Sequence, residues 1–351
     1  MEDKSPVFLT GRFRSGTTAL WRVFEEHPGF QAYYEPLHDG LLGHIAFTSP
    51  SKGHRGVESY WGAYHNILPD LHSSYRRDFG TDRLLLEADQ HHDELESYLR
   101  MLIDRSQPLR PVLQFNRVDF RLPWLRRKFP EATIIHLVRN PRDTWVSSRR
   151  HLKTATWDDA LEVDAFDLMQ WTMSLAGEFP FLADPANSAY VRHYQLARLS
   201  GLMGERCADV TLSFEADLLG AGVPAGSKLV EAGVLSAADL PHLESVIDHD
   251  QGESWSKIRP AGWFEAQEAQ AEAQLDGLGL TAQFGYEPLS RIRSTFADEW
   301  DRLALDENHL RQTLLLKLSE CRSEQTRLLH EIDQLEARLP KSEDESERSE
   351  N

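Results

Sequence analysis

The 351-residue chain has few cysteines, no long apolar run and fewer basic than acidic residues. Its two cysteines, Cys207 and Cys321, make neither a disulfide framework nor a zinc pattern, so we expect a reducing compartment. No apolar run approaches the roughly eighteen residues of a membrane span. The first predicted strand begins by residue 7, which leaves no room for a cleaved signal, and we therefore expect a cytoplasmic protein.

The charge balance also limits the partners. Lys and Arg total 38 against 56 Asp and Glu, a formal net charge of −18, which argues against non-specific binding to nucleic acid. Apolar residues make up 40% of the chain and charged residues 27%, which is typical of a soluble globular protein. The length allows one large core with residues left for an appendage.

Residues 7–21, VFLTGRFRSGTTALW, predict a strand, a glycine-bounded loop and a helix. Gly11 and Gly16 let successive N–H groups point inward, and the positive end of the helix dipole favours an anion there. Nucleotide-binding loops of the GxxxxGK[ST] type have a lysine where this chain has Thr17. Arg14 inside the bend offers a planar fork of donors instead. The loop therefore predicts a site for a phosphate or a close relative, the alternative being an ordinary turn.

Further apolar runs predict a parallel sheet. Strand-like stretches and the helical segments between them alternate along the chain, which is typical of an α/β fold with a P-loop-like parallel sheet flanked by helices. The predicted strands are FQAYYEPL (30–37), PVLQF (111–115), TIIHLV (133–138) and VTLSF (210–214). The predicted helices include a stripe of Leu122, Leu125 and Phe129 and the stretches 164–180 and 187–206. Residues 38–80 have weak periodicity and predict loops and short helices that cover a substrate.

A second motif, IIHLVRNPRDTWVSSRR, occupies residues 134–150. Arg139 ends the strand, Asn140 is a predicted helix cap and Pro141 suits the first helical position. Ser147 lies two helical turns after the cap and faces the same way. Arg139 and Ser147 can therefore converge on one anion at the carboxyl end of the sheet, where open parallel sheets bind ligands. Taken alone, they could also be a surface ion-pair partner and a solvated hydroxyl.

Together the two motifs resemble those of the sulfotransferase superfamily, which uses 3′-phosphoadenosine-5′-phosphosulfate (PAPS). TGRFRSGTTAL is similar to its 5′-phosphosulfate loop, and LVRNPRDTWVSS is similar to its 3′-phosphate motif, with the Arg and the Ser eight positions apart. The resemblance continues through YYEPL and TLSFEADL to FGYEPL near residue 285. It implies a sulfotransferase domain over residues 1–290.

The resemblance also implies site residues. By it, the 5′ phosphosulfate contacts the loop residues Arg12, Arg14, Ser15, Gly16, Thr17 and Thr18, and the 3′ phosphate contacts Arg139 and Ser147. KIRPAGW, residues 257–263, is weakly similar to the loop that closes over the 3′-phosphoadenosine, which makes Arg259 a third partner. The resemblance implies PAPS as co-substrate and no metal.

The transfer needs a base for the acceptor hydroxyl. In-line sulfuryl transfer develops charge on the leaving phosphate oxygen, which Arg14 and the loop amides would stabilise. Cytosolic members of the family place a histidine after the strand before the 3′-phosphate motif, but here that segment reads QFNR (114–117). Carbohydrate-type and bacterial members use a glutamate, which Glu35 in YYEPL matches, with His38 as the other candidate. The Glu35 match favours a glycan or glycolipid hydroxyl as acceptor; alternatively, Glu35 is a strand-end carboxylate bonded to backbone.

Two rival functions stay open at this stage. The TLSFE and LLLEAD runs each end near a carboxylate, as does the magnesium-positioning strand of a P-loop small-molecule kinase. A catalytically inactive member could act as a binding module, although a base and two anion sites argue against that. QHHDE (90–94) has no partner ligands at useful spacing, so we expect no metal. The aromatic residues Tyr60, Trp61 and Tyr64 would either stack on a sugar ring or cover a core edge.

From about residue 291 the pattern changes. Apolar residues alternate steps of four and three, the seam of a coiled coil, at Leu314, Leu318, Cys321, Gln325, Leu328, Ile332, Leu335 and Leu339. We expect a helical region over 291–340 that forms a homodimer through 310–339, or else packs back on the core. Residues 341–351 predict a disordered acidic tail.

Overall fold

The computed structural model describes residues 5–47, 59–149, 166, 168–219, 224–247, 255 and 258–276. All of them belong to one compact unit, Met1–Thr295. The predicted helix and tail beyond residue 291, with the coiled-coil seam, lie outside the described residues. Within the described part of the chain, no helix is both long and apolar enough to span a bilayer.

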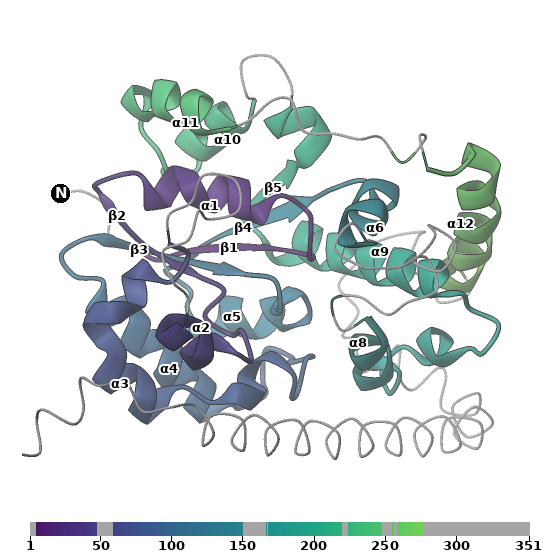
Figure 1. Cartoon of the computed structure of the whole chain (residues 1–351), viewed down its shortest axis with the longest axis horizontal. Helices are drawn as coiled ribbons and strands as arrows, with labels where there is room; N and C mark the ends of the chain where they lie inside the picture. The colour runs from purple at the N-terminus through teal and green to yellow at the C-terminus, as the bar shows by residue number, and fades with distance from the viewer. Residues whose placement is uncertain are drawn as a thin grey trace, which may run out of the picture. The chain divides into compact units, whose positions relative to one another are not determined.

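A five-stranded parallel sheet forms the centre of this unit (Figure 1). Its strands are β1 (Val7–Gly11), β2 (Phe30–Tyr34), β3 (Arg110–Phe115), β4 (Thr133–Val138) and β5 (Val210–Ser213). Their order across the sheet is β2-β3-β1-β4-β5. Because β1 pairs with both β3 and β4, the loop that leaves β1 opens at the middle of the sheet's carboxyl edge, next to the loops that follow those two strands.

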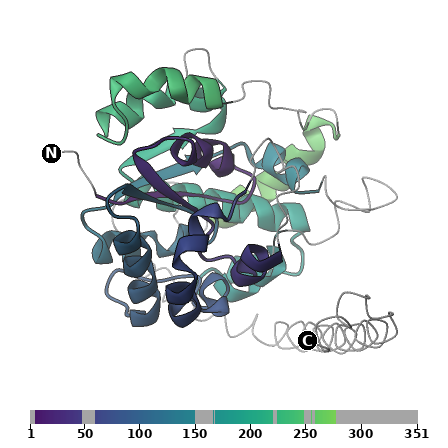
Figure 2. The same cartoon turned by 60° about the vertical axis from the view of Figure 1, so that its left-hand side comes forward.

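Helices cover both faces of the sheet, which confirms the predicted α/β fold (Figures 1 and 2). One face carries α1 (Thr17–Glu25), α10 (Ala225–Glu231) and α11 (Leu240–Val246). The other carries α4 (Asp93–Arg105), α5 (Leu122–Lys128) and α9 (Ala189–Cys207). The remaining α-helices of the described residues are α2 (Leu41–Phe47), α3 (Leu68–Ser74), α6 (Pro141–Arg149), α8 (Leu168–Leu175) and α12 (Ala261–Asp276), of which α6 and α12 pack on α9.

Alternation along the central strands builds a core layer on each face. Val7 and Leu9 of β1 point to the α1 side, where they join a buried cluster with Leu20 and Leu212. Phe8 points to the other side, and its ring packs edge-on against Phe129, with centroids 5.3 Å apart. Strands buried on both faces are apolar at nearly every position, which is why these segments could be predicted from the sequence.

The segment predicted to cover a substrate folds as short helices where it is described. After α2, residues 48–58 lie outside the described part, and then come two 3₁₀ helices, Gly62–Ile67 and Arg77–Gly80, with α3 between them. Tyr64 is fully buried and its hydroxyl donates to the Tyr34 carbonyl at 2.9 Å. Trp61 is also buried. Tyr64 and Trp61 therefore cover a core edge instead of offering an open face to a sugar ring.

Candidate functional site

The loop between β1 and α1 has the geometry of an anion cradle. Gly16 is the N-cap of α1 with φ of 102°, and a Cβ there would lie 2.4 Å from the Phe214 ring, so only glycine fits. Arg14 also has a positive φ, 67°, which is uncommon for a residue with a side chain. No side chain of the described residues caps α1, so its first N–H groups face the loop. The sequence thus places backbone donors and Arg14 around one point.

Two loop hydroxyls are already engaged within the protein. Ser15 Oγ donates to the Arg12 carbonyl at 2.7 Å, and Thr17 Oγ1 donates to Asn116 Oδ1 at 3.0 Å. A hydroxyl has one proton to donate. The Ser15 N–H also donates to the Arg12 carbonyl, at 3.1 Å. In this conformation Thr17 can therefore offer an oxyanion its backbone N–H group but not its hydroxyl proton, and Ser15 has both its N–H and its hydroxyl proton engaged.

Arg14, Arg139 and Ser147 come together at the carboxyl ends of β1 and β4. Arg14 Nε donates to Ser147 Oγ at 3.0 Å, and Arg139 Nη1 donates to the Arg14 carbonyl at 3.2 Å. The Arg139 guanidinium also lies over the Phe214 ring, 4.1 Å from its centroid. Two motifs that are more than a hundred residues apart thus supply two guanidinium groups and a hydroxyl to one place.

The start of α6 follows the predicted capping pattern. Asn140 Oδ1 accepts from the Arg142 N–H at 2.9 Å, and Pro141 is the first helical residue. Glu215 fixes the other side of the cap, because its Oε1 accepts from the Asn140 N–H at 2.9 Å. These contacts set the direction of α6 and hence the position of Ser147, which is 6% exposed.

His193 of α9 contacts the first turn of α6. Its Nε2 lies 2.9 Å from Thr144 Oγ1 and 3.1 Å from the Pro141 carbonyl. Because the Thr144 hydroxyl donates its proton to Pro141, the His193 Nε2 must be the protonated nitrogen. Burial, with the charges of Arg149 and Arg12, lowers the pKa of His193 to about 3, so the ring is neutral.

Glu35 lies directly after β2, and its carboxylate accepts hydrogen bonds from two side chains. Oε1 accepts from Asn116 Nδ2 at 2.7 Å and Oε2 accepts from Arg117 Nη1 at 2.7 Å. Its backbone has φ of 39° and its N–H donates to Gln114 Oε1 at 3.3 Å. Both carboxylate oxygens thus have side-chain donors from the segment after β3. The alternative was a carboxylate bonded to backbone, whereas among the described residues the two donors to this carboxylate are the side chains of Asn116 and Arg117.

Thr18 and Tyr34 lie between the loop and Glu35. Thr18 is on the first turn of α1, and its Oγ1 lies 3.1 Å from the Tyr34 hydroxyl. Tyr34 is the last residue of β2, next to Glu35. Burial, together with the nearby Glu35 charge, raises the pKa of Tyr34, so its phenol stays protonated. The contact between the Thr18 and Tyr34 hydroxyls thus links the predicted loop residue Thr18 to the residue that precedes the predicted base, Glu35.

His38 lies close to Glu35 and is also neutral. Burial lowers its pKa; the Arg117 charge acts in the same direction and the Glu35 charge opposes it. Its Nδ1 accepts from the Gly40 N–H at 3.0 Å and is 3.3 Å from Asp39 Oδ1. The lowered pKa favours the Gly40 hydrogen bond over an ion pair with Asp39. His38 therefore stays a second candidate for a proton acceptor.

Arg12 is tied to a buried carboxylate. Its Nη1 lies 3.3 Å from Asp119 Oδ2, and its guanidinium lies 4.4 Å from the Trp171 ring centroid. Asp119 is fully buried and also accepts from Thr10 Oγ1 at 3.4 Å. The structure thus gives Arg12 a partner inside the protein and connects the loop to the segment after β3.

The segment that contains Arg259 lies next to α6. The Arg259 N–H donates to the Trp255 carbonyl at 3.2 Å, and the Trp255 N–H donates to Asp143 Oδ1 in the first turn of α6 at 3.2 Å. The Arg259 guanidinium lies 5.8 Å from the Trp263 ring centroid. This places the weakly matching KIRPAGW segment beside the helix that carries Ser147.

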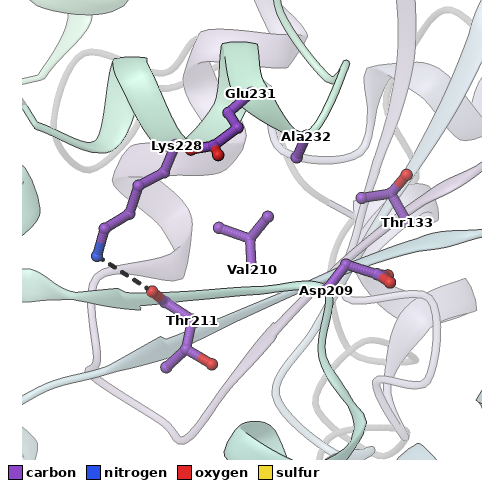
Figure 3. Close-up of a pocket in the computed structure, with 7 residues that line it drawn as sticks. All are labelled: Thr133, Asp209, Val210, Thr211, Lys228, Glu231 and Ala232. Atoms are coloured by element: carbon purple, nitrogen blue, oxygen red, sulfur yellow. Dashed lines mark hydrogen bonds between the residues drawn. The ribbon is translucent and has the colours of Figure 1, made fainter.

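A hollow of about 570 Å³ lies at the other end of the sheet (Figure 3). It is bounded by α10 and by the amino ends of β4 and β5. Lys228 Nζ donates to the Thr211 carbonyl at 3.4 Å and to Asp217 Oδ2 at 2.8 Å, and Asp209 Oδ2 accepts from the Ile134 N–H at 2.7 Å. Lys228 and Asp209 are thus engaged in holding the fold. The hollow also lies at the amino ends of the strands, whereas open parallel sheets bind ligands at the carboxyl ends.

One of the carboxylates that suggested a magnesium site, Glu215 of the TLSFE run, has another partner. Its Oε1 accepts from the Asn140 N–H at 2.9 Å. Asp217, two residues on, accepts from the Ser213 N–H at 2.7 Å and from Lys228. Among the described residues, no group of three His, Cys, Asp or Glu side chains is arranged to hold a metal ion.

Sequence reasoning missed four side chains that organise the site, namely Asn116, Arg117, Asp119 and His193. The first three lie within the four residues that follow the buried strand β3. That position, at the carboxyl end of a strand next to β1, is a signal that could have identified them. His193 has no comparable signal, because it lies within α9, in its second turn, and not at the end of a strand.

Comparison with known proteins gives matches of two kinds. A family model described as "Sulfotransferase family" matches residues 6–197, more than half of the 351 residues. Among solved structures, the chain is similar to a sulfotransferase domain from the olefin synthase of Synechococcus PCC 7002, with 14% identity and a TM-score of 0.30, covering 85% of this chain and 96% of that one. No curated protein matches the chain.

Proposed function

The chain belongs to the sulfotransferase family, and from this we propose that it transfers the sulfuryl group of PAPS to an acceptor hydroxyl, with a glycan or glycolipid as the favoured acceptor. The observation that carries the proposal is the convergence of Arg14, Arg139 and Ser147 at the carboxyl edge of the sheet. PAPS has an anionic group at each of two positions, and this convergence offers donors for both.

The residues present suit the two anionic groups of the donor. Arg14 and the loop N–H groups would bind the 5′ phosphosulfate, because guanidinium and backbone donors match an oxyanion. Arg139 and Ser147 would bind the 3′ phosphate. Ser147 Oγ accepts from Arg14, which leaves its own proton to donate to a phosphate oxygen. Arg259, beside α6, would be a third partner.

The reaction moves one group and one proton. The acceptor oxygen forms a bond to sulfur while the bond between sulfur and the 5′-phosphate oxygen breaks, and the electron pair stays on the departing 3′-phosphoadenosine-5′-phosphate. Arg14 and the loop N–H groups face that developing charge. The acceptor proton goes to Glu35, whose carboxylate Asn116 and Arg117 orient. Neutral His38 is the other base within this cluster.

Calorimetry with 3′-phosphoadenosine-5′-phosphate and with ATP, each with and without magnesium, tests the donor class. We expect micromolar binding of the bisphosphate that does not depend on magnesium. A preference for Mg-ATP would favour the P-loop kinase, and failure to bind either nucleotide would favour a binding module without activity.

Two variants test the 3′-phosphate assignment. Arg139→Ala should weaken binding of the bisphosphate by about 1.5 to 3 kcal/mol, the usual contribution of a hydrogen bond to a charged group, and Ser147→Ala by less. Adenosine-5′-phosphosulfate lacks the 3′ phosphate, so its affinity should change little. Arg105→Ala, an exposed arginine paired with Asp70, is the control. Equal losses for both ligands would show that the assignment is wrong.

A further inference from the structure

Asn116 connects the loop proposed to bind the donor with the carboxylate proposed to act as base. Its Oδ1 accepts from Thr17 Oγ1 at 3.0 Å and from Gln114 Nε2 at 3.1 Å. Its Nδ2 donates to Glu35 Oε1 at 2.7 Å. Asn116 is 6% exposed and Gln114 is fully buried. A short, buried chain of hydrogen bonds therefore runs from the first residue of α1 to the end of β2.

The polarity of this chain admits one orientation of the amide. An ionised carboxylate can only accept, so Glu35 requires the Nδ2 end of Asn116, and Oδ1 then faces Thr17. Thr17 must donate its hydroxyl proton to that oxygen. Gln114 supports both ends, since its Nε2 donates to Asn116 while its Oε1 accepts from the Glu35 N–H at 3.3 Å.

We propose that Asn116 is a positioning residue that fixes the base Glu35 relative to the donor loop through the hydroxyl of Thr17; this rests on the proposed function. Arg117 holds the other carboxylate oxygen, so the two donors together fix the plane of the carboxylate. Reacting atoms must lie about 3 to 3.5 Å apart, and a misplacement of about 1 Å can cost about a hundredfold in rate. Holding base and donor on one network keeps that distance constant.

The proposal changes the role expected of Thr17. The resemblance implies that Thr17 contacts the phosphosulfate, whereas its hydroxyl proton is given to Asn116. Its side chain should therefore matter for turnover and hardly for donor affinity. A hydroxyl that bound the donor directly would show the opposite pattern.

Thr17→Val and Thr17→Ser separate these two roles. Valine keeps the shape but lacks the hydroxyl, and serine keeps the hydroxyl. We expect both variants to bind 3′-phosphoadenosine-5′-phosphate within threefold of the parent. Single-turnover transfer from labelled PAPS, to glycans that the parent sulfates in a screen, should fall at least tenfold in Thr17→Val and stay within threefold in Thr17→Ser. A loss of bisphosphate affinity above tenfold in Thr17→Val alone would overturn the proposal.

A double-mutant cycle tests whether the two residues act in series. Asn116→Ala should lower single-turnover transfer at least tenfold, and adding Thr17→Val should lower it no further, since the network is already broken. Additive losses would overturn the proposal. Asn187→Ala is the matched control, because Asn187 is also a buried asparagine and donates to the Phe181 carbonyl away from the site. If Asn116→Ala does not fold, the comparison of Thr17→Val with Thr17→Ser tests the proposal without it.

A spectroscopic test needs neither donor nor acceptor. The side-chain amide resonances of Asn116, assigned by their loss in Asn116→Ala or Asn116→Asp, should move in both Thr17→Val and Glu35→Gln. Resonances that stay in place in either variant would overturn the link. The proposed function would be wrong if the parent protein did not bind the bisphosphate. The resonance shifts in Thr17→Val and Glu35→Gln would still test the hydrogen-bond network, because they need no ligand.

Discussion

Glu268→Gln should loosen α12 from the rest of the domain, because the Glu268 carboxylate joins it to both α6 and α9. Arg142 of α6 donates from Nε to Oε1 at 2.7 Å and from Nη2 to Oε2 at 2.5 Å. The hydroxyl of Tyr190 in α9 donates to Oε1 at 2.6 Å. The side chains of Arg142 and Glu268 are each 16% exposed, so water screens the pair only in part.

The size of the effect follows from these contacts. A hydrogen bond to a charged group contributes about 1.5 to 3 kcal/mol, and glutamine keeps one acceptor oxygen while losing the charge. We therefore expect the free energy of unfolding to fall by about 2 kcal/mol. Since the shift per kcal/mol shrinks with domain size, the melting temperature should fall by about 3 to 6 °C. The bisphosphate should also bind less tightly, because Arg142 stacks on Trp255 in the segment that contains Arg259.

Calorimetric melting at two pH values tests this reasoning. Glu265→Gln, an exposed carboxylate on the same helix, is the matched control and should change the melting temperature little. Burial alone would raise the pKa of Glu268, but the hydrogen bonds from Arg142 and Tyr190 outweigh it and hold the pKa below the ordinary value of 4.5. The pair therefore stabilises the fold above about pH 4.5 and the difference from the parent should close in more acidic solution. A melting temperature equal to that of the control, or a difference that persists in acid, would refute the argument.

Three further predictions concern other parts of the chain. Glu35→Gln should leave bisphosphate affinity nearly unchanged while single-turnover transfer falls at least about a hundredfold, about 2.7 kcal/mol of barrier; turnover within threefold of the parent would point to His38. His193→Gln should make the loss of stability in acid less steep, since the pKa of His193 is held at about 3 and the unfolded chain takes up a proton below about 6.5. Denaturant titrations of parent and variant at pH 7 and 5 measure this, and equal losses would contradict it. Light scattering should show a dimer that becomes monomeric when the chain is cut after residue 295, with bisphosphate binding retained; a monomeric full-length chain would contradict the coiled-coil prediction.

The strands could be predicted because of where they lie in the sheet. TIIHLV coincides with β4 at both ends, since a central strand buried on both faces is apolar at almost every position. The edge strands were predicted too long. β2 stops at Tyr34 because Glu35 leaves the strand with positive φ, and β5 stops at Ser213 because Phe214 begins a π-helical turn.

The helices differ in how much of their packing is apolar. α4 places Leu95, Tyr98, Leu99 and Leu102 inward at helical spacing, a pattern from which this helix could have been predicted. α12 buries only Phe264, Ala271 and Leu275 and is held on α9 largely by polar contacts, such as the hydrogen bond from Tyr194 to Glu272. Apolar periodicity cannot reveal such a helix, because its partners are polar groups on other segments.

The residues of the candidate site also differ in how far the sequence predicts them. Residues that act through local rules, such as Asn140 and Pro141 at the start of α6, follow from their immediate sequence. The network of Glu35 with Asn116 and Arg117 does not, because it depends on β2 lying beside β3 although about eighty residues separate the two. Strand order is a property of the whole sheet, and no local pattern encodes it.

The absence of a lysine from the loop has a consequence for donor recognition. With Thr17 turned toward Asn116, positive charge at the loop comes from Arg14, and Arg14 Nε already reaches Ser147 Oγ at 3.0 Å. The loop and the second motif thus share one hydrogen bond. A ligand with an anion at only one position would engage one motif and leave the other unused, whereas a donor with both a 5′ phosphosulfate and a 3′ phosphate would engage both. On the proposed function, this explains why selectivity for PAPS over ATP should depend on Arg139 and Ser147 more than on the loop itself.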